Sequence, residues 1–123
     1  MTPNKTSQPV GGKVKNGVVE DYFKDGTVCA RGSYRNGEKT GQWKYYLRTG
    51  GLRAVGQYSK GKLSGAWKWY RENGKLMQTG SFKDQKRTGT WKRFHPNGAL
   101  YDEGRFTNDK KTGEGAHITR TVS

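Results

Sequence analysis

Apolar and polar residues alternate along the chain in short runs that are separated by glycine-containing turns. An alternation of period two is typical of half-buried β-strands, and no segment shows the 3.6-residue period of an amphipathic helix. Asn-Gly and Asp-Gly between apolar runs favour type I′ hairpin turns, because both central residues of that turn need φ > 0. The pattern therefore predicts a series of antiparallel β-hairpins. Their turns are expected at Asp25-Gly26, Thr49-Gly50, Asn73-Gly74 and Asn97-Gly98.

The hairpins recur with a period of 24 residues. Three copies begin at a tryptophan and cover residues 43–66, 67–90 and 91–114, and a fourth copy, 19–42, has Val19 at the tryptophan position. Periods of this size indicate an array in which each unit buries its apolar face only against its neighbours. We therefore predict an all-β fold, a single-layer array of antiparallel β-hairpins built from four 24-residue repeats.

The segments on either side of the array are short. Residues 1–18 are predicted to form a flexible basic N-terminal segment, and residues 115–123 a C-terminal cap and tail with Gly115 at the next tryptophan position. No stretch approaches the roughly 20 apolar residues that a membrane-spanning helix needs, and the first residues contain no apolar run. The only cysteine, Cys29, leaves no internal disulfide and fits a reducing compartment. We therefore expect a cytoplasmic protein.

Glycines and aromatic residues recur in register within the repeats. A glycine inside a strand lowers stability unless another group approaches it closely. The glycines at one strand position are therefore expected to make room for large rings: Gly32, Gly56, Gly80 and Gly104. Alternation after a turn places four residues on that same face of the second strand: Leu52, Ala54, Gly56 and Tyr58. The predicted aromatic core comprises Trp43, Trp67, Trp91, Tyr58, Phe82 and Phe106.

A second set of glycines lies two residues before each tryptophan position. These glycines are expected where one hairpin passes to the next: Gly41, Gly65, Gly89 and Gly113.

The repeats resemble a known family. Units of the form G-x-W-x-x-Y-x-x-N-G-x-L-x-x-x-G-x-F, such as WKWYRENGKLMQTGSF over residues 67–82, are similar to the MORN-type repeat, and most to its bacterial variety with Trp-Lys at the strand start. The resemblance covers about residues 19–118. It implies an elongated β-hairpin ribbon that serves as an interaction platform. It also implies a role as an antitoxin or immunity partner of a secreted bacterial toxin.

The chain departs from the family pattern at four positions. Val19 and Gly115 replace tryptophan, and Gln85 and Asp109 replace the second-turn glycine that stands at Gly37 and at Gly61. We therefore expect irregular ends of the array.

Composition alone would favour disorder, but the aromatic content argues for folding. Leu, Ile, Val and Phe make up only 17 of 123 residues in a highly charged chain. The chain nevertheless has 4 Trp, 7 Tyr and 4 Phe, and each large ring buries more area than a small aliphatic side chain. A folded array is therefore the better interpretation.

Positive charge is concentrated in the central repeats. The net charge is +14, and residues 43–66 contain five cationic and no acidic side chains. Stacked hairpins should align equivalent lysines in rows, with neighbours about 10 Å apart, and such rows favour an acidic partner. Two sets share a repeat position: Lys44, Lys68 and Lys92, and Lys62, Lys86 and Lys110. The residues expected to bind the partner are Lys44, Arg48, Arg53, Lys60, Lys62, Lys68, Arg71 and Lys75.

The sequence leaves several functions open and argues against others. His95, His117 and the single cysteine lack the spacing of metal ligands, and no phosphate loop or nucleophile motif is present. We expect no enzyme, metal or cofactor. The first hypothesis is a scaffold that binds an acidic protein, such as a toxin or effector. The alternatives are a nucleic-acid-binding protein and a peripheral protein on anionic lipid. The same lysines could instead serve only to keep a thin ribbon soluble and free of edge-to-edge pairing.

Overall fold

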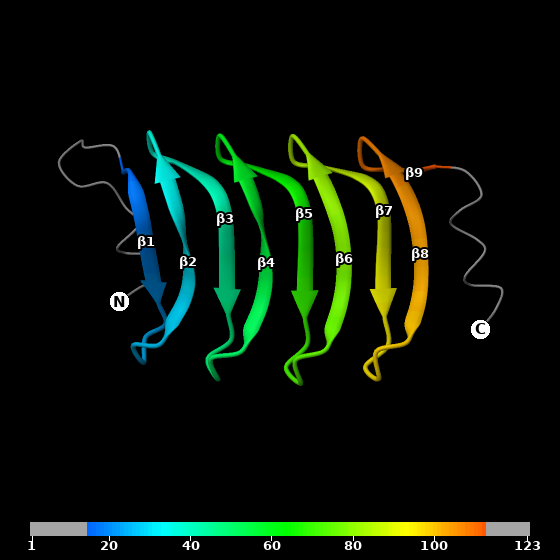
Figure 1. Ribbon diagram of the computed structural model, residues 1–123, viewed down its shortest axis with the longest axis horizontal. Coiled ribbons are helices and arrows are strands. Elements are labelled where there is room, and N and C mark those ends of the chain that lie inside the picture. The colour runs from blue at the N-terminus through cyan, green and yellow to red at the C-terminus, as the bar shows by residue number, and fades with distance from the viewer. Residues whose placement is uncertain (1–14, 113–123) are drawn as a thin grey trace.

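The computed structural model describes residues 15–112. They form one open sheet of nine antiparallel strands in sequential order, so β1 and β9 lie at opposite ends of the ribbon (Figure 1). Within these residues there is no helix, and the predicted all-β array of hairpins is confirmed. The strands are β1 (Gly17–Tyr22), β2 (Val28–Arg35), β3 (Glu38–Tyr46), β4 (Leu52–Ser59), β5 (Lys62–Tyr70), β6 (Leu76–Lys83), β7 (Lys86–Phe94), β8 (Leu100–Thr107) and β9 (Lys110–Thr112).

The limits of the predicted segments fall partly outside this description. β1 begins at Gly17, two residues before the first predicted repeat. Most of the predicted N-terminal segment, together with Gly113 and the cap and tail from Gly115 onward, lies outside the described residues.

Two kinds of turn alternate along the sheet, and they lie at opposite ends of the strands (Figure 1). We call the two borders of the ribbon formed by these turns its turn edges, and refer to either one as an edge. Wide connections fall at the four predicted dipeptides. In the second of them, the Leu47 N–H donates to the Gly51 carbonyl at 2.8 Å and the Gly50 N–H donates to the Leu47 carbonyl at 2.9 Å. Of the residues in these connections, only the glycine has φ > 0, at 97° for Gly50. The prediction of type I′ geometry there was wrong, because a longer turn closed by one left-handed glycine joins the strands.

Type I′ turns occur at the other edge instead. Both central residues have positive φ, as in Asn36 at 53° and Gly37 at 82°. The same geometry recurs without glycine at Asp84 and Gln85, with φ of 51° and 74°. The expectation that replacing the glycine makes this turn irregular was therefore wrong.

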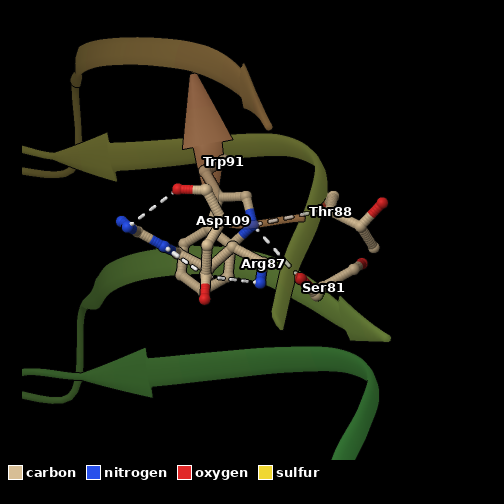
Figure 2. Close-up of polar contacts among 5 residues, drawn as sticks. All are labelled: Ser81, Arg87, Thr88, Trp91 and Asp109. Carbon is tan, nitrogen blue, oxygen red and sulfur yellow. Dashed lines mark hydrogen bonds and ion pairs between the residues drawn. The ribbon is translucent and has the colours of Figure 1, made fainter. Parts of the chain in front are cut away.

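Contacts to the preceding hairpin explain why glycine is dispensable at this turn. The backbone N–H of Gln85 donates to the Leu63 carbonyl at 3.0 Å, and its side-chain oxygen accepts from the Leu63 N–H at 2.8 Å. Asp109 makes the same two contacts with Arg87. Its backbone N–H donates to the Arg87 carbonyl, and its carboxylate accepts from the Arg87 N–H (Figure 2). These hydrogen bonds offset the cost of placing a residue with a Cβ at positive φ.

The sheet contains a β-bulge next to each wide connection. Tyr45 pairs with Ala54, whereas Tyr46 pairs with Leu52, so β4 carries one extra residue. Because Tyr45 and Tyr46 point to opposite faces of the sheet, Leu52 and Ala54 also lie on opposite faces. The prediction that these two residues share a face was therefore wrong, and the same shift affects Leu76 and Leu100.

A second irregularity surrounds the glycines that precede each tryptophan. Arg31 pairs with Lys44 and Ser33 pairs with Thr40, so three residues of β3 stand opposite one residue of β2. Gly41 lies within this bulge at a φ of 67°. The expectation that these glycines connect one hairpin to the next was wrong, because they lie inside β3, β5 and β7.

The core of this single layer consists of tryptophans seated on glycines of the preceding hairpin. A Cβ built on Gly32 would lie 2.0 Å from Trp43, one on Gly56 1.8 Å from Trp67, and one on Gly80 2.1 Å from Trp91. The prediction that these glycines make room for the rings is confirmed. Each indole N–H also donates to a backbone carbonyl of the preceding hairpin, which for Trp91 is that of Ser81. The Trp91 N–H is shared with the Thr88 carbonyl of its own strand (Figure 2).

Most of the predicted core residues are buried. The three tryptophans and Phe106 are buried, while Tyr58 and Phe82 are half-buried and meet the tryptophans edge-on. Sequence analysis missed the aromatic residue two positions after Trp43 and after Trp67. Tyr45 stacks on Trp43 and Trp67, and Trp69 stacks on Trp67.

Candidate partner-binding surface

The face of the sheet opposite the tryptophans carries a straight row of charged residues. Residues in register across neighbouring strands point to the same face, so a row can be followed from strand to strand. From β1 to β8 this row comprises Glu20, Arg31, Lys44, Val55, Lys68, Thr79, Lys92 and Glu103. We call this face the lysine face, and the opposite one the tryptophan face. The predicted alignment of Lys44, Lys68 and Lys92 is therefore present.

The three lysines of this row are exposed and occupy every second strand. Strands in a sheet are about 4.8 Å apart, so neighbouring lysines lie about 10 Å apart. The ends of the row are acidic: Arg31 forms an ion pair with Glu20 at 3.4 Å, and Glu103 is the cross-strand partner of Lys92. Among residues 15–112, neither Lys44 nor Lys68 forms an ion pair. The centre of the row therefore presents uncompensated positive charge.

An apolar row runs beside the lysines and begins two residues beyond each lysine on its own strand. It is formed by pairs in register: Tyr22 with Val28, Tyr46 with Leu52, Tyr70 with Leu76, and Phe94 with Leu100. The two central pairs are half-buried, and Leu100 is 44% exposed. On the other side of the lysines lie short uncharged polar side chains, including Gln42, Gln57 and Ser64. The lysine face therefore has an apolar stripe, a cationic stripe and a polar stripe in parallel.

A shallow depression of about 270 Å³ opens on this face near its N-terminal end. Its lining includes Arg31, Ser33, Gln42, Lys44 and Tyr46. The cationic, polar and apolar stripes therefore border one concave area at this point.

The structure does not bring the eight predicted binding residues together. Only Lys44 and Lys68 belong to the central row of the lysine face. Lys60 lies in a type I′ turn, and Lys62 begins β5 at the same edge of the sheet. Arg48, Arg71 and Lys75 lie at the opposite edge, in the wide connections. The sequence could not predict these positions, because they depend on the register between strands.

Three of the predicted arginines have contacts of their own. The Arg71 guanidinium donates to the Phe94 carbonyl at 2.9 Å and so ties two repeats together. Arg48 lies over the ring of Phe23, 5.5 Å from its centroid. Arg53 is the extra residue of the β4 bulge and lines a cavity of about 270 Å³ with Lys39 and Tyr45.

On the tryptophan face a lysine is enclosed by three rings. The ammonium nitrogen of Lys39 lies 4.8 Å from the ring centroid of Trp43, 5.1 Å from that of Tyr58 and 5.7 Å from that of Tyr45. It donates to the Tyr45 hydroxyl at 3.2 Å, and the Tyr45 and Tyr58 hydroxyls lie 2.8 Å apart. Burial lowers the pKa of Lys39. The ring faces offset part of this cost by attracting the cation.

Burial, followed by the hydrogen bond to Tyr58, raises the pKa of Tyr45 far above its ordinary value of 10.0. A raised tyrosine pKa stabilises the fold below the unfolded-state pKa, and this contribution is lost as pH rises toward the folded-state value. We expect Tyr45→Phe to show a shallower loss of unfolding free energy than the parent above about pH 10. Denaturant titrations at a series of alkaline pH values would measure this slope. Tyr101→Phe, at an exposed tyrosine, is the control; equal slopes for parent and Tyr45→Phe would contradict the expectation.

Buried carboxylates mark the two ends of the tryptophan face. Asp21 and Asp102 are 7% and 8% exposed and occupy register positions that carry Tyr45 or Ala54 in the middle repeats. Arg93 forms a bidentate ion pair with Asp102, and this pairing raises the pKa of Arg93. Polar groups thus replace the apolar ones at the ends of the stack, as in other repeat arrays.

Among residues 15–112, no group of three or more His, Cys, Asp or Glu side chains could hold a metal ion. In the same range no helix is long and apolar enough to cross a membrane.

Two segments of the chain, residues 63–84 and 87–108, match the family model described as a MORN repeat variant. The resemblance to MORN-type repeats is confirmed for these two segments. A search of curated proteins finds no match.

Solved structures offer only distant likenesses. The crystal structure of TarM is 12% identical with a TM-score of 0.49, over 90% of this chain and 22% of that chain. The GtfA/B complex bound to UDP and GlcNAc is 15% identical with a TM-score of 0.40, over 99% of this chain and 28% of that chain. The chain thus spans less than a third of either protein, and neither likeness bears on what it does.

Proposed function

We propose that this chain, which carries two MORN-variant repeats, is a non-enzymatic scaffold that binds an acidic protein through its lysine face. The observation that carries the proposal is the alignment of Lys44, Lys68 and Lys92 in one cross-strand row. A coherent row of cations makes a positive field that attracts an acidic surface and orients it along the ribbon.

The apolar stripe favours a protein partner over a nucleic acid. Protein interfaces combine an apolar centre with a polar or charged rim, and aromatic residues are enriched in that centre. The stripe with Tyr46 and Tyr70 lies next to the lysines on the same face and can supply such a centre. Binding to a nucleic-acid backbone needs only the cations and would leave the apolar stripe unused.

A finer version of the proposal is that binding inhibits the partner, as an antitoxin or immunity protein inhibits a toxin. Its support is the resemblance of the repeats to the bacterial variety. A cytoplasmic location belongs to the same version, because such inhibitors protect the cell that makes the toxin.

Charge reversal on the lysine face tests the proposal. We expect Lys44→Glu/Lys68→Glu to abolish capture of the physiological partner while the melting temperature stays within a few degrees, because both side chains are exposed. Lys60→Glu/Lys75→Glu changes the net charge equally at the two turn edges and should retain capture. The measurement is affinity capture from native lysate with the parent and both variants, with and without nuclease, followed by mass spectrometry.

The two variants and the nuclease step separate the outcomes. Loss of the same captured protein with both double variants would mean that charge acts as a bulk property, and the proposal would fail. Loss of all captured material after nuclease treatment would instead identify a nucleic-acid-binding protein.

A further inference from the structure

Resting on the proposed function, we propose that the element bound by the lysine face is an amphipathic acidic α-helix lying along the ribbon, across the strands. The lysine row defines the distance between neighbouring positive charges and the direction in which they follow one another. These two properties distinguish between kinds of partner.

The spacing of the lysines matches the repeat of a helix. Lys44, Lys68 and Lys92 stand on every second strand, about 10 Å apart along a line perpendicular to the strands. A helix rises 1.5 Å per residue, so acidic residues seven positions apart are about 10.5 Å apart and lie on nearly the same side. Three such residues therefore face three lysines at once.

Other regular polymers fit this row less well. Along a β-strand, residues on one face recur about every 6.7 Å, so their spacing is about 6.7 or 13.4 Å and misses the lysines. In duplex DNA a phosphate about 10 Å further along the axis has rotated by roughly a third of a turn, because one turn takes about 10 base pairs. Of these three polymers, only the α-helix keeps charges at this spacing on one side.

The apolar stripe beside the lysines is the reason for proposing that the helix is amphipathic. Tyr46, Tyr70 and Phe94, each paired with a leucine, recur on the same strands as the lysines and hence with the same spacing. Their row is displaced from the lysine row by two residues, about 7 Å, which is less than the 10 Å diameter of a helix. A helix can therefore place acidic residues on the lysines and apolar residues on the aromatic row simultaneously.

Two synthetic peptides of 18 residues test this inference. One carries glutamates at positions 1, 8 and 15 and leucines at positions 4, 11 and 18. The other has the same composition with glutamates every fifth residue, which distributes them around the helix. Helix content is matched by circular dichroism, and affinity for the full chain is measured by fluorescence anisotropy at physiological salt. We expect the seven-residue spacing to bind at least tenfold more tightly, and Lys44→Glu/Lys68→Glu to remove this preference.

The outcomes separate this inference from the proposed function. Equal affinity of both peptides, weakened by Lys44→Glu/Lys68→Glu and not by Lys60→Glu/Lys75→Glu, overturns the helix and leaves the acidic partner standing. Equal weakening by both double variants overturns the helix and the proposed function together. Tighter binding of a single-stranded oligothymidylate than of either peptide also overturns the helix.

Discussion

Replacing Trp67 with alanine is expected to lower the free energy of unfolding by roughly 3–5 kcal/mol, close to the whole stability of a small domain. Trp67 is 3% exposed and contacts four rings, two in the preceding hairpin and two in its own. Its indole N–H donates to the Gln57 carbonyl at 3.1 Å, so truncation also removes this hydrogen bond. The loss would open a cavity in the middle of the array.

The comparison with Trp91 makes this prediction specific. Trp91 is 8% exposed and contacts three rings, of which only Phe106 lies on its C-terminal side. We therefore expect Trp91→Ala to cost less than Trp67→Ala in chemical denaturation. Lys68→Ala, on the neighbouring residue of the opposite face, should change stability by less than about 0.5 kcal/mol. A larger loss for Trp91→Ala than for Trp67→Ala would show that the array is not anchored at its centre.

Adding a single methyl group at Gly80 should also destabilise the array strongly. A Cβ at this position would lie 2.1 Å from a ring carbon of Trp91, far inside van der Waals contact. The indole cannot move away without losing its seat and its hydrogen bonds to Ser81 and Thr88. We expect Gly80→Ala to cost about 3 kcal/mol and Gly80→Val to cost more, measured by thermal or denaturant unfolding.

Gly51→Ala is the matched control for this substitution. A Cβ on Gly51 would meet no atom closer than 3.7 Å, and its backbone is not in the left-handed region. Alanine there restricts the unfolded chain and should be neutral or stabilising by up to about 1 kcal/mol. Opposite signs at Gly80 and Gly51 are therefore expected. A Gly80→Ala variant that melts within about a degree of the parent would contradict this account of the packing.

The sequence predicted the parts of the fold that repeat at a fixed offset. Trp67 and Gly56 are found together because both recur every 24 residues and because a large ring and a missing side chain are complementary. Leu52 was misplaced because alternation assumes an unbroken strand, and the bulge at Arg53 reverses it. Type I′ turns were assigned to the wrong edge because Asn-Gly occurs in both kinds of turn, at Asn36-Gly37 and at Asn73-Gly74. The geometry of Asp84 and Gln85 depends instead on hydrogen bonds to the preceding hairpin.

The candidate surface was predicted less completely than the core. Net charge and repeat position correctly placed Lys44 and Lys68 in one row. They could not separate these lysines from Lys60 or Arg53, because the edge or face that a cation occupies depends on register and bulges. The apolar stripe was invisible for the same reason, since Leu52 had been assigned to the tryptophan face.

Trp43, Trp67 and Trp91 are each seated on a glycine eleven residues earlier, in the preceding hairpin. A duplicated segment of 24 residues contains one such glycine and one such tryptophan. Its tryptophan would pack on the glycine of the unit before it, and its glycine would receive the tryptophan of the unit after it. Such an array can therefore grow by tandem gene duplication with no compensating substitution, whereas an insertion between a glycine and its tryptophan would separate that pair. Every added unit would extend the lysine face by about 10 Å. Under the proposed function, the number of repeats would set how long a stretch of the partner the array can contact, while the chemistry of each contact stays the same.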